Sequence, residues 1–386
     1  MSKALQGKIQ NGKDPNEGRS RAKNINASEL EYDKEQLFDG LLTSGLDQAS
    51  CISKVQSHLY CKASPSPHKP SPYLISKLRS YEKLHKWCGT NSRDYNINVK
   101  KIVHSKIINR AAAASMCKYL VLKPCNGLGN QMITTAATFL YAILTDRVLL
   151  IRFDKESMAY SSDQYFVPSL FMNPSFNLEI TKMFLYHLGR YLFLPSNEAW
   201  KLIRRFYETY LAKADEMIGF QIRVFIPDSV PQQATMDLVL SCTLKNKLHP
   251  KIDTQNSVSS STRKSKTVKV VLVASLYPEN GENLKAMYLN KPTVSGELIE
   301  VYQLRHEEHQ NFGDNKNSMK AWTEMYLLSL SDVLVTTSLS TFGYAAQGLG
   351  GLKPWLLYKL TNNETHFPAC EQDLSLQPCY HVPPKH

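Results

Sequence analysis

The stretch that decides the fold is KYLVLKPCNGLGNQ, residues 118–131. Residues 118–123 form an apolar run that predicts a strand, and the glycine-bearing loop 126–130 follows it. Apolar residues then continue to about Leu144, as in a helix, and a second apolar run over 147–152 predicts another strand. Strand, loop, helix and strand in this order predict a βαβ unit, in which a covering helix joins two parallel strands.

The second half of the chain repeats this alternation, so we expect a second parallel sheet. Its predicted elements are a helix over 197–217, strands over 218–225, 267–275 and 333–336, a Ser-rich loop over 257–266, a helix over 319–330, a turn over 338–343 and a helix over 344–349. An earlier helix is predicted to begin near Pro72 and to end by Gly89. The economical arrangement is two α/β domains that face a cleft, with ligands at the carboxyl ends of the strands.

Length and composition agree with this arrangement. The 386 residues, 42% of them hydrophobic, suffice for two domains with separate cores. The net charge of +12 favours a phosphate-bearing ligand, a polyanion or an acidic membrane surface. Because no zinc-finger or RNA-recognition pattern accompanies the charge, we expect no nucleic-acid partner. Residues 1–30 are polar and basic, so we expect a disordered leader without a membrane anchor.

Eight cysteines are spread along the chain. They include no C-x-x-C pair and no His/Cys cluster of metal-ligand spacing, so we expect no metal site. In an oxidising compartment the spacing favours local disulfides, among Cys51, Cys61 and Cys88 and between Cys370 and Cys379. In a reducing compartment the same residues would be buried thiols, and the count does not choose between the two.

The loop 126–130 is the first candidate binding element. Its glycines let the backbone approach a ligand closely, and the free amides of the following helix N-terminus favour an anion. A nicotinamide-binding fingerprint would need glycine or alanine at position 132, which is Met132, so an oxidoreductase rests only on this loop and on Asp154. The remaining interpretation is a tight turn that binds nothing.

Arg223 is the second candidate, in the apolar run IGFQIRVF over 218–225. A guanidinium among apolar neighbours needs a partner. It either pairs with a structural carboxylate or points out of the strand end toward a ligand, where its fork would bind phosphate oxygens.

The third candidate is the turn after the strand 333–336. Buried strand, hydroxyl-rich turn, glycine and helix follow one another over residues 333–351. This order suits phosphate, held by backbone amides together with the hydroxyls of Ser340 and Thr341. The alternative is an ordinary helix N-cap, although the turn carries more hydroxyls than one cap needs.

Five runs of sequence resemble the plant xyloglucan and arabinogalactan fucosyltransferases, glycosyltransferase family 37. They are FGYAAQGLGGLKPW over 342–355, CNGLGN over 125–130, YFVPSL over 165–170, HLGRYLF over 187–193 and KLRSYEKLH over 77–85. The similarity extends in order from about residue 37 to residue 384. The chain is therefore identified as a member of this family.

The resemblance implies a GT-B fold, in which two Rossmann-like domains face a central cleft. Residues 31–200 would form the acceptor-side domain and residues 201–386 the GDP-fucose-binding domain. The implied reaction is an inverting, metal-independent transfer of L-fucose from GDP-fucose to galactose of a cell-wall polysaccharide, which forms an α-(1,2) linkage. No cofactor is expected, since GDP-fucose is a co-substrate. A homodimer is compatible with the resemblance.

Site residues follow from the matching motifs. Arg223 would be catalytic and would bind the diphosphate. The other implied donor contacts are Asn126, Gly127, Leu128, Gly129 and Asn130 in the loop, and Ser340, Thr341, Phe342 and Gly343 in the turn. His187 and Arg190 would belong to the acceptor side of the cleft, and no residue stands out as general base.

The resemblance further implies a type II membrane protein of the Golgi lumen. Asn26 and Asn363 stand in glycosylation acceptor patterns that agree with this location. The chain departs from the family by a shortening near 155–162, by an abbreviated tail and by Gln131, where the family has Arg. These departures raise the alternative of a non-catalytic or defective relative that still binds GDP-fucose.

Overall fold

The computed structural model describes residues 39–42, 52–60, 68–90, 92–96, 117–124, 126–151, 184–224, 232–253, 267–289, 291, 293–308, 315–358 and 368–375. The predicted leader, the two acceptor patterns at Asn26 and Asn363, and the predicted shortening near 155–162 lie outside these ranges. Among the described helices, none combines the length and apolar character needed to cross a lipid bilayer.

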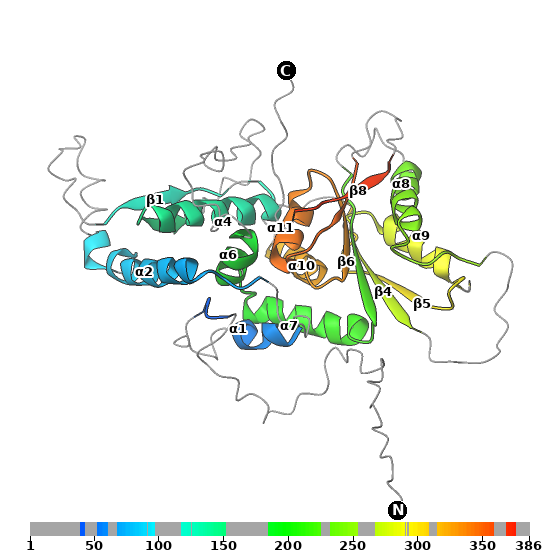
Figure 1. Cartoon of the computed structure of the whole chain (residues 1–386), viewed down its shortest axis with the longest axis horizontal. Coiled ribbons are helices and arrows are strands. Elements are labelled where there is room, and N and C mark those ends of the chain that lie inside the picture. The colour runs from blue at the N-terminus through cyan, green and yellow to red at the C-terminus, as the bar shows by residue number, and fades with distance from the viewer. Residues whose placement is uncertain are drawn as a thin grey trace, which may run out of the picture.

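A six-stranded sheet forms the larger part of the molecule (Figure 1). Its order is β5 (Leu298–Gln303), β4 (Val268–Ala274), β3 (Glu216–Gln221), β6 (Val333–Thr337), β7 (Trp355–Leu357) and β8 (Cys370–Gln372). Every neighbouring pair is parallel except β7 with β8. The central strands are buried on both faces, which explains why they are nearly continuous apolar runs in the sequence.

Helices cover both faces of this sheet. One face carries α7 (Asn197–Phe206), α10 (Asn315–Leu328) and α11 (Thr341–Gly350), whose buried side chains form one core with the sheet. The other face carries α8 (Gln232–Lys245) and α9 (Pro278–Tyr288), which belong to a second core. The result is a three-layer α/β sandwich, as the alternating pattern predicts.

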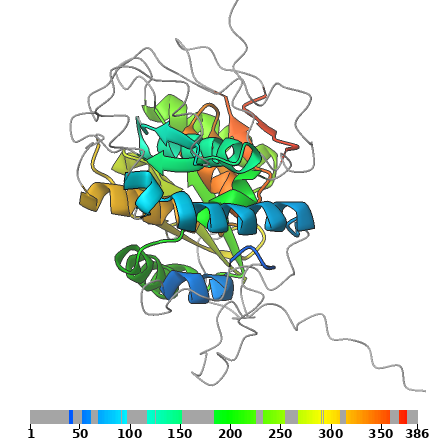
Figure 2. The same cartoon turned by 90° about the vertical axis from the view of Figure 1, so that its left-hand side faces the viewer.

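The smaller unit consists of α2 (Pro72–Cys88), β1 (Tyr119–Leu122), α4 (Leu128–Leu144), β2 (Val148–Ile151) and α6 (Phe184–Leu192). Strands β1 and β2 are parallel and α4 joins them, so the predicted βαβ unit is confirmed. Figure 2, which looks onto the smaller unit, shows α2 lying across it. In Figure 1, α10 and α11 lie between the smaller unit and the six-stranded sheet.

Two short helical segments precede α2. They are α1 (Ile52–Gln56) and the 3-10 helix η2 (Ser57–Tyr60). Ser53 donates its hydroxyl to the carbonyl of Pro195 at 2.7 Å, just before α7 begins. This contact attaches the leading segment to the face of the sheet that carries α7.

Helix α2 follows its sequence signals closely. The hydroxyl of Ser71 accepts a hydrogen bond from the amide of Leu74 at 3.2 Å, and Pro72 occupies the first helical position. The helix ends at Cys88, directly before Gly89. The prediction for this helix is confirmed.

The predicted helix over 197–217 is wrong at its carboxyl end. Helix α7 ends at Phe206, a π-helical turn η5 (Tyr207–Leu211) follows, and β3 begins at Glu216. The continuous apolar pattern hides this change, because Tyr207, Leu211 and Met217 are all buried in one core. Elements α8, α9, β5, β7 and β8 were not predicted from the sequence.

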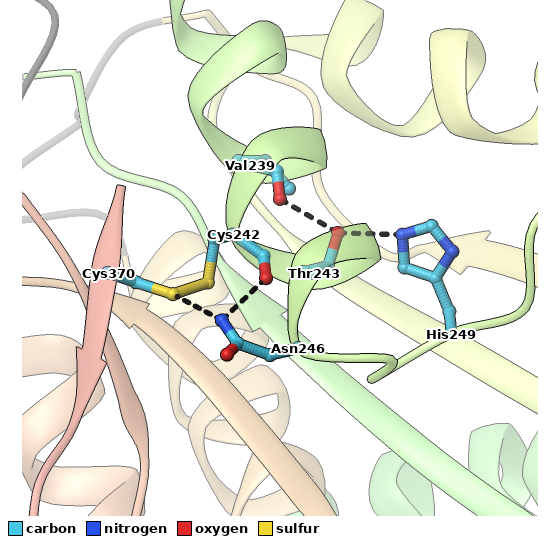
Figure 3. Close-up of a disulfide and its surroundings, with 6 residues drawn as sticks. All are labelled: Val239, Cys242, Thr243, Asn246, His249 and Cys370. Atoms are coloured by element: carbon cyan, nitrogen blue, oxygen red, sulfur yellow. Dashed lines mark hydrogen bonds between the residues drawn. A yellow bond between two sulfur atoms is a disulfide. The ribbon is translucent and has the colours of Figure 1, made fainter. Parts of the chain in front are cut away.

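Within the described residues, two disulfides connect cysteines that are distant in the sequence. Cys88 pairs with Cys117, and Cys242 of α8 pairs with Cys370 of β8 (Figure 3). The predicted local partners of Cys88 and Cys370 are therefore wrong. The physical reason is the antiparallel pairing of β8 with β7, which brings Cys370 beside α8, with the two Cα atoms 5.4 Å apart.

A buried polar network lies beside this second disulfide (Figure 3). The Nε2 atom of His249 is 2.7 Å from the hydroxyl of Thr243, and its Nδ1 atom contacts the hydroxyl of Tyr288. Burial lowers the pKa of His249 to about 4, with a smaller lowering by the charge of Lys269. The neutral imidazole is therefore part of the packed core.

This network makes stability depend on pH. The pKa of His249 is lower in the folded protein than in the unfolded chain, so the unfolded chain binds more protons between pH 6.5 and about 4. The contribution of neutral His249, about 3 kcal/mol at most, is complete above pH 6.5 and is lost as the pH falls toward 4. We expect His249→Gln to flatten this part of the curve of unfolding free energy against pH, measured by urea denaturation. The matched control is His85→Gln at an exposed position, and equal slopes for both variants would contradict the prediction.

Candidate functional site

Two helix N-termini meet at Gly129. A Cβ atom at this position would lie 2.6 Å from the carbonyl carbon of Thr341 and 2.8 Å from the amide nitrogen of Phe342. Only glycine permits this approach, because the atoms in contact are backbone atoms that cannot rotate away. The contact places the loop at the start of α4 directly against the first turn of α11, so two of the predicted binding elements are neighbours.

Gly343 brings the same turn onto the carboxyl ends of the central strands. Its Cα faces the side chains of Thr336 at the end of β6 and Gln221 at the end of β3, with no room for a Cβ atom. The hydroxyl of Thr336 donates to Oε1 of Gln221 at 2.7 Å and joins the two strand ends. The turn therefore lies at the carboxyl edge of the sheet, where parallel α/β sheets bind ligands.

Arg223 lies just beyond β3, not within a strand. Strand β3 ends at Gln221, so the prediction of a strand through 218–225 is wrong at its end, and Phe225 lies outside the described residues. The backbone amide of Arg223 donates to the hydroxyl of Thr337 at 2.9 Å. Its backbone is thereby fixed beside the turn that follows β6, which fits the interpretation that it leaves the strand end near a ligand site.

The turn after β6 is shorter than predicted. Helix α11 begins at Thr341, so Thr341, Phe342 and Gly343 form its first turn. Leu339 has a positive φ of 64°, and its amide donates to the hydroxyl of Tyr344 at 2.7 Å. This tight reversal explains how the chain passes from strand to helix in so few residues.

Ser340 stands at the N-cap position of α11 and is buried. Its side chain makes no capping hydrogen bond, so the ordinary N-cap interpretation is wrong for this hydroxyl. The amides of the first turn have no partner within the helix itself. An anion at this end would find backbone donors together with the positive end of the helix dipole.

Sequence reasoning missed Arg305, which follows β5. Its guanidinium carbon lies 5.8 Å from the centre of the Phe342 ring, and its Nε atom is 2.6 Å from Oε2 of Glu324 on α10. Glu324 is fully buried, and burial raises its pKa to about 7 against the opposing effect of Arg305. The available sequence signal was Glu324, a charged residue inside the predicted helix over 319–330.

His187 and Arg190 lie elsewhere, on α6. His187 is buried, and its pKa is lowered to about 4. Burial is the larger cause, and the positive charge of Arg190 is a smaller one. The Arg190 guanidinium lies 4.1 Å from the centre of the Tyr186 ring, and its Nε atom donates to the carbonyl of Leu349 at 3.5 Å. Leu349 is at the carboxyl end of α11, about 12 Å along the helix from Thr341. The acceptor role of both residues stays a prediction.

The described part of the chain contains no group of three or more His, Cys, Asp and Glu side chains that could hold a metal ion. Near the turn lie the guanidinium of Arg305, which is a charged donor, and the backbone amides of the first turn of α11, which are neutral donors. Both bind anions well. The arrangement is therefore chemically suited to phosphate groups.

Comparisons with known proteins match this chain to fucosyltransferases. The family model described as "Xyloglucan fucosyltransferase" matches residues 9–160 and 156–386. A galactoside 2-alpha-L-fucosyltransferase of Arabidopsis thaliana is 40% identical over 448 aligned positions, which cover 93% of this chain and 79% of the relative. The protein of the same name from Pisum sativum is 37% identical over 444 positions, which cover 92% and 77%.

A solved structure is also similar. It is a variant of Arabidopsis thaliana FUT1 in complex with GDP, with a TM-score of 0.77 and 38% sequence identity, and the match covers 90% of this chain and 93% of that chain. The alignments with the two sequence relatives are longer than this chain, so they contain gaps on its side. The two matches to the family model meet at residues 156–160.

The close approach at Gly129 predicts a large effect of a small substitution. We expect Gly129→Ala to force apart the starts of α4 and α11 and to lower the free energy of unfolding by about 1–3 kcal/mol. The measurement is urea denaturation followed by tryptophan fluorescence. The control is Thr138→Ala on the same helix, and an unchanged denaturation midpoint for Gly129→Ala would contradict the geometry.

Proposed function

The chain belongs to the xyloglucan fucosyltransferase family, and from this premise we propose that it transfers L-fucose from GDP-fucose to galactose of a cell-wall glycan, with an α-(1,2) linkage. The observation that carries the proposal is the meeting of Gly129, Arg223 and the first turn of α11 at the carboxyl ends of β3 and β6. The similar FUT1 structure, which contains GDP, supports a nucleotide-sugar donor. The fold is α/β and GT-B-like.

The proposed transfer is a single displacement with inversion. The oxygen of a galactose hydroxyl attacks C1 of fucose, the bond from C1 to the diphosphate oxygen breaks, and the hydroxyl proton leaves to a base or to solvent. Negative charge grows on the leaving diphosphate. In this proposal Arg223 and the amides at the start of α11 stabilise that charge, as oxyanion donors do in acyl transfer, and the position of the Arg223 backbone beside Thr337 supports it.

Metal independence belongs to this proposal. Guanidinium groups and oriented amides supply positive potential to a diphosphate, and this is one of the functions that a metal ion performs in other transferases. The general base stays unassigned. A loose transition state with strong leaving-group stabilisation needs little basic assistance.

An oxidising location is a further part of the proposal. The two disulfides, Cys88–Cys117 and Cys242–Cys370, support a compartment such as the Golgi lumen, because cytosolic proteins rarely keep structural disulfides. The polysaccharide acceptor, the role of His187 and Arg190 at its site, and a homodimer are proposed on family grounds.

A second candidate function is binding of GDP-fucose without transfer. It is favoured by one observation, the gaps on this chain's side of the alignments, since lost residues of the acceptor-side domain would remove acceptor contacts. Unpaired strand edges would also reduce stability.

The first experiment measures transfer directly. We expect the full chain, incubated with labelled GDP-fucose and galactose-bearing xyloglucan, to incorporate label that α-(1,2)-specific fucosidase releases. A folded sample that binds GDP in calorimetry but incorporates nothing would favour the second candidate.

The second experiment addresses Arg223. We expect Arg223→Ala to reduce kcat by about 10²–10³, equivalent to about 3–4 kcal/mol, because a charged donor to the leaving group is lost. The control is Arg204→Ala, which removes an arginine paired with Glu208 on the surface of α7. Turnover within threefold of the unmodified chain would refute a catalytic role of Arg223.

A further inference from the structure

Arg305 is held at the carboxyl end of the sheet by three hydrogen bonds. Its amide donates to Oε1 of Glu324 at 3.0 Å, and its Nε atom donates to Oε2 of the same carboxylate at 2.6 Å. The side chain of Gln303 donates to the carbonyl of Arg305 at 2.6 Å. Backbone and side chain of Arg305 are thus fixed together.

The loop around Arg305 is fixed in the same way. Gln303 also donates to the carbonyls of Ser275 and Tyr277 at 3.0 and 3.1 Å, so one amide group joins the loops that follow β4 and β5. Gly281 of α9 leaves the space that the Gln303 side chain occupies. This arrangement resembles the supporting residues that orient a ligand-binding side chain.

The outer half of the Arg305 guanidinium makes no hydrogen bond to the described residues. Within the described residues, neither Nη atom of Arg305 makes a hydrogen bond, although only 14% of its side chain is exposed. The neighbouring Glu307 is paired with Lys320 at 2.9 Å, and it also interacts electrostatically with Arg305. The four N–H groups on these two nitrogens belong to a nearly buried cation whose guanidinium carbon lies 5.8 Å from the centre of the Phe342 ring.

The guanidinium of Arg305 adjoins the proposed donor site. Phe342 lies in the first turn of α11. Together with Thr341, it supplies the backbone atoms that Gly129 approaches. Arg305 therefore shares with Arg223 the turn that the proposed function assigns to the diphosphate. A diphosphate carries more than one negative charge, and Arg223 supplies a single positive charge.

We propose that Arg305 is a second cationic ligand of the donor diphosphate and that Glu324 is the positioning residue that orients its guanidinium. This inference rests on the proposed function. The Nε side of the fork binds Glu324 and the Nη side is left for phosphate oxygens, a division that arginine permits and lysine does not.

The alternative is that Arg305 only neutralises a buried carboxylate. A structural counterion is expected to use its Nη groups on the protein, because an unpartnered donor in a nearly buried position has a cost. The more exposed pair of Arg204 on α7 with Glu208 on η5 shows such use, with both Nε and Nη2 of Arg204 on the carboxylate. This pair is the matched control.

The experiment compares two ligands on the full chain. GDP and guanosine displace a fluorescent GDP analogue from the unmodified protein and from Arg305→Lys, Glu324→Gln and Arg204→Lys. We expect Arg305→Lys to weaken GDP about 10- to 100-fold, since charge-assisted hydrogen bonds are lost, while guanosine changes less than threefold. Glu324→Gln should weaken GDP by a smaller factor, and Arg204→Lys should change neither ligand.

Three outcomes would overturn the inference. Unchanged GDP affinity of Arg305→Lys, while Arg223→Ala loses affinity, removes Arg305 from the site and leaves the proposed function intact. Equal losses for GDP and guanosine assign Arg305 to another part of the nucleotide or to structure alone. No binding of GDP by the unmodified, folded chain removes the proposed function and the inference together. Thermal melting of each variant identifies any loss that is due to unfolding.

Discussion

The contact of Gly129 with the backbone of Thr341 and Phe342 is the constraint on which the rest of the structure depends. It allows α4 to reach the first turn of α11, and Met132 of α4 then joins the core beneath the six-stranded sheet. Helix α11 is rich in small residues for the same reason, because Gly343 lies on Thr336 and Gly348 on Leu185. Close backbone packing on several sides, not side-chain chemistry, sets the position of the site.

Electrostatics then decides what the site can hold. The first turn of α11 presents free amides, Arg223 follows β3, and Arg305 follows β5. Each arginine is held by another side chain of the protein. The hydroxyl of Thr337 fixes the backbone of Arg223, and the carboxylate of Glu324 fixes the guanidinium of Arg305. A fully buried carboxylate is costly, so its retention beside an arginine is more readily explained by orientation than by stability.

Local patterns were sufficient to predict the elements that lie close together in the sequence. The βαβ unit from β1 to β2, the start of α2 near Pro72 and the strand before the hydroxyl-rich turn were all predicted, because hydrophobic periodicity and proline act within a few residues. The position of Arg223 inside an apolar run indicated this residue, and the family motif gave its expected role. The Arg305–Glu324 pair and the disulfide partners could not be predicted, since these contacts depend on which strands become neighbours. The predicted end of the helix that begins at Asn197 was also wrong, because one apolar pattern continues through helix, π-helical turn and strand.

The bond between Cys242 and Cys370 has a consequence for the integrity of the chain. The two cysteines are 128 positions apart, and the segment between them contains Arg305, Glu324 and the whole of α11. A protease that cuts once anywhere within that segment leaves the fragments covalently joined, and the separated pieces remain opposite one another. Under oxidising conditions a nicked molecule can therefore keep its ligand-binding edge assembled, whereas a reductant would let the fragments part.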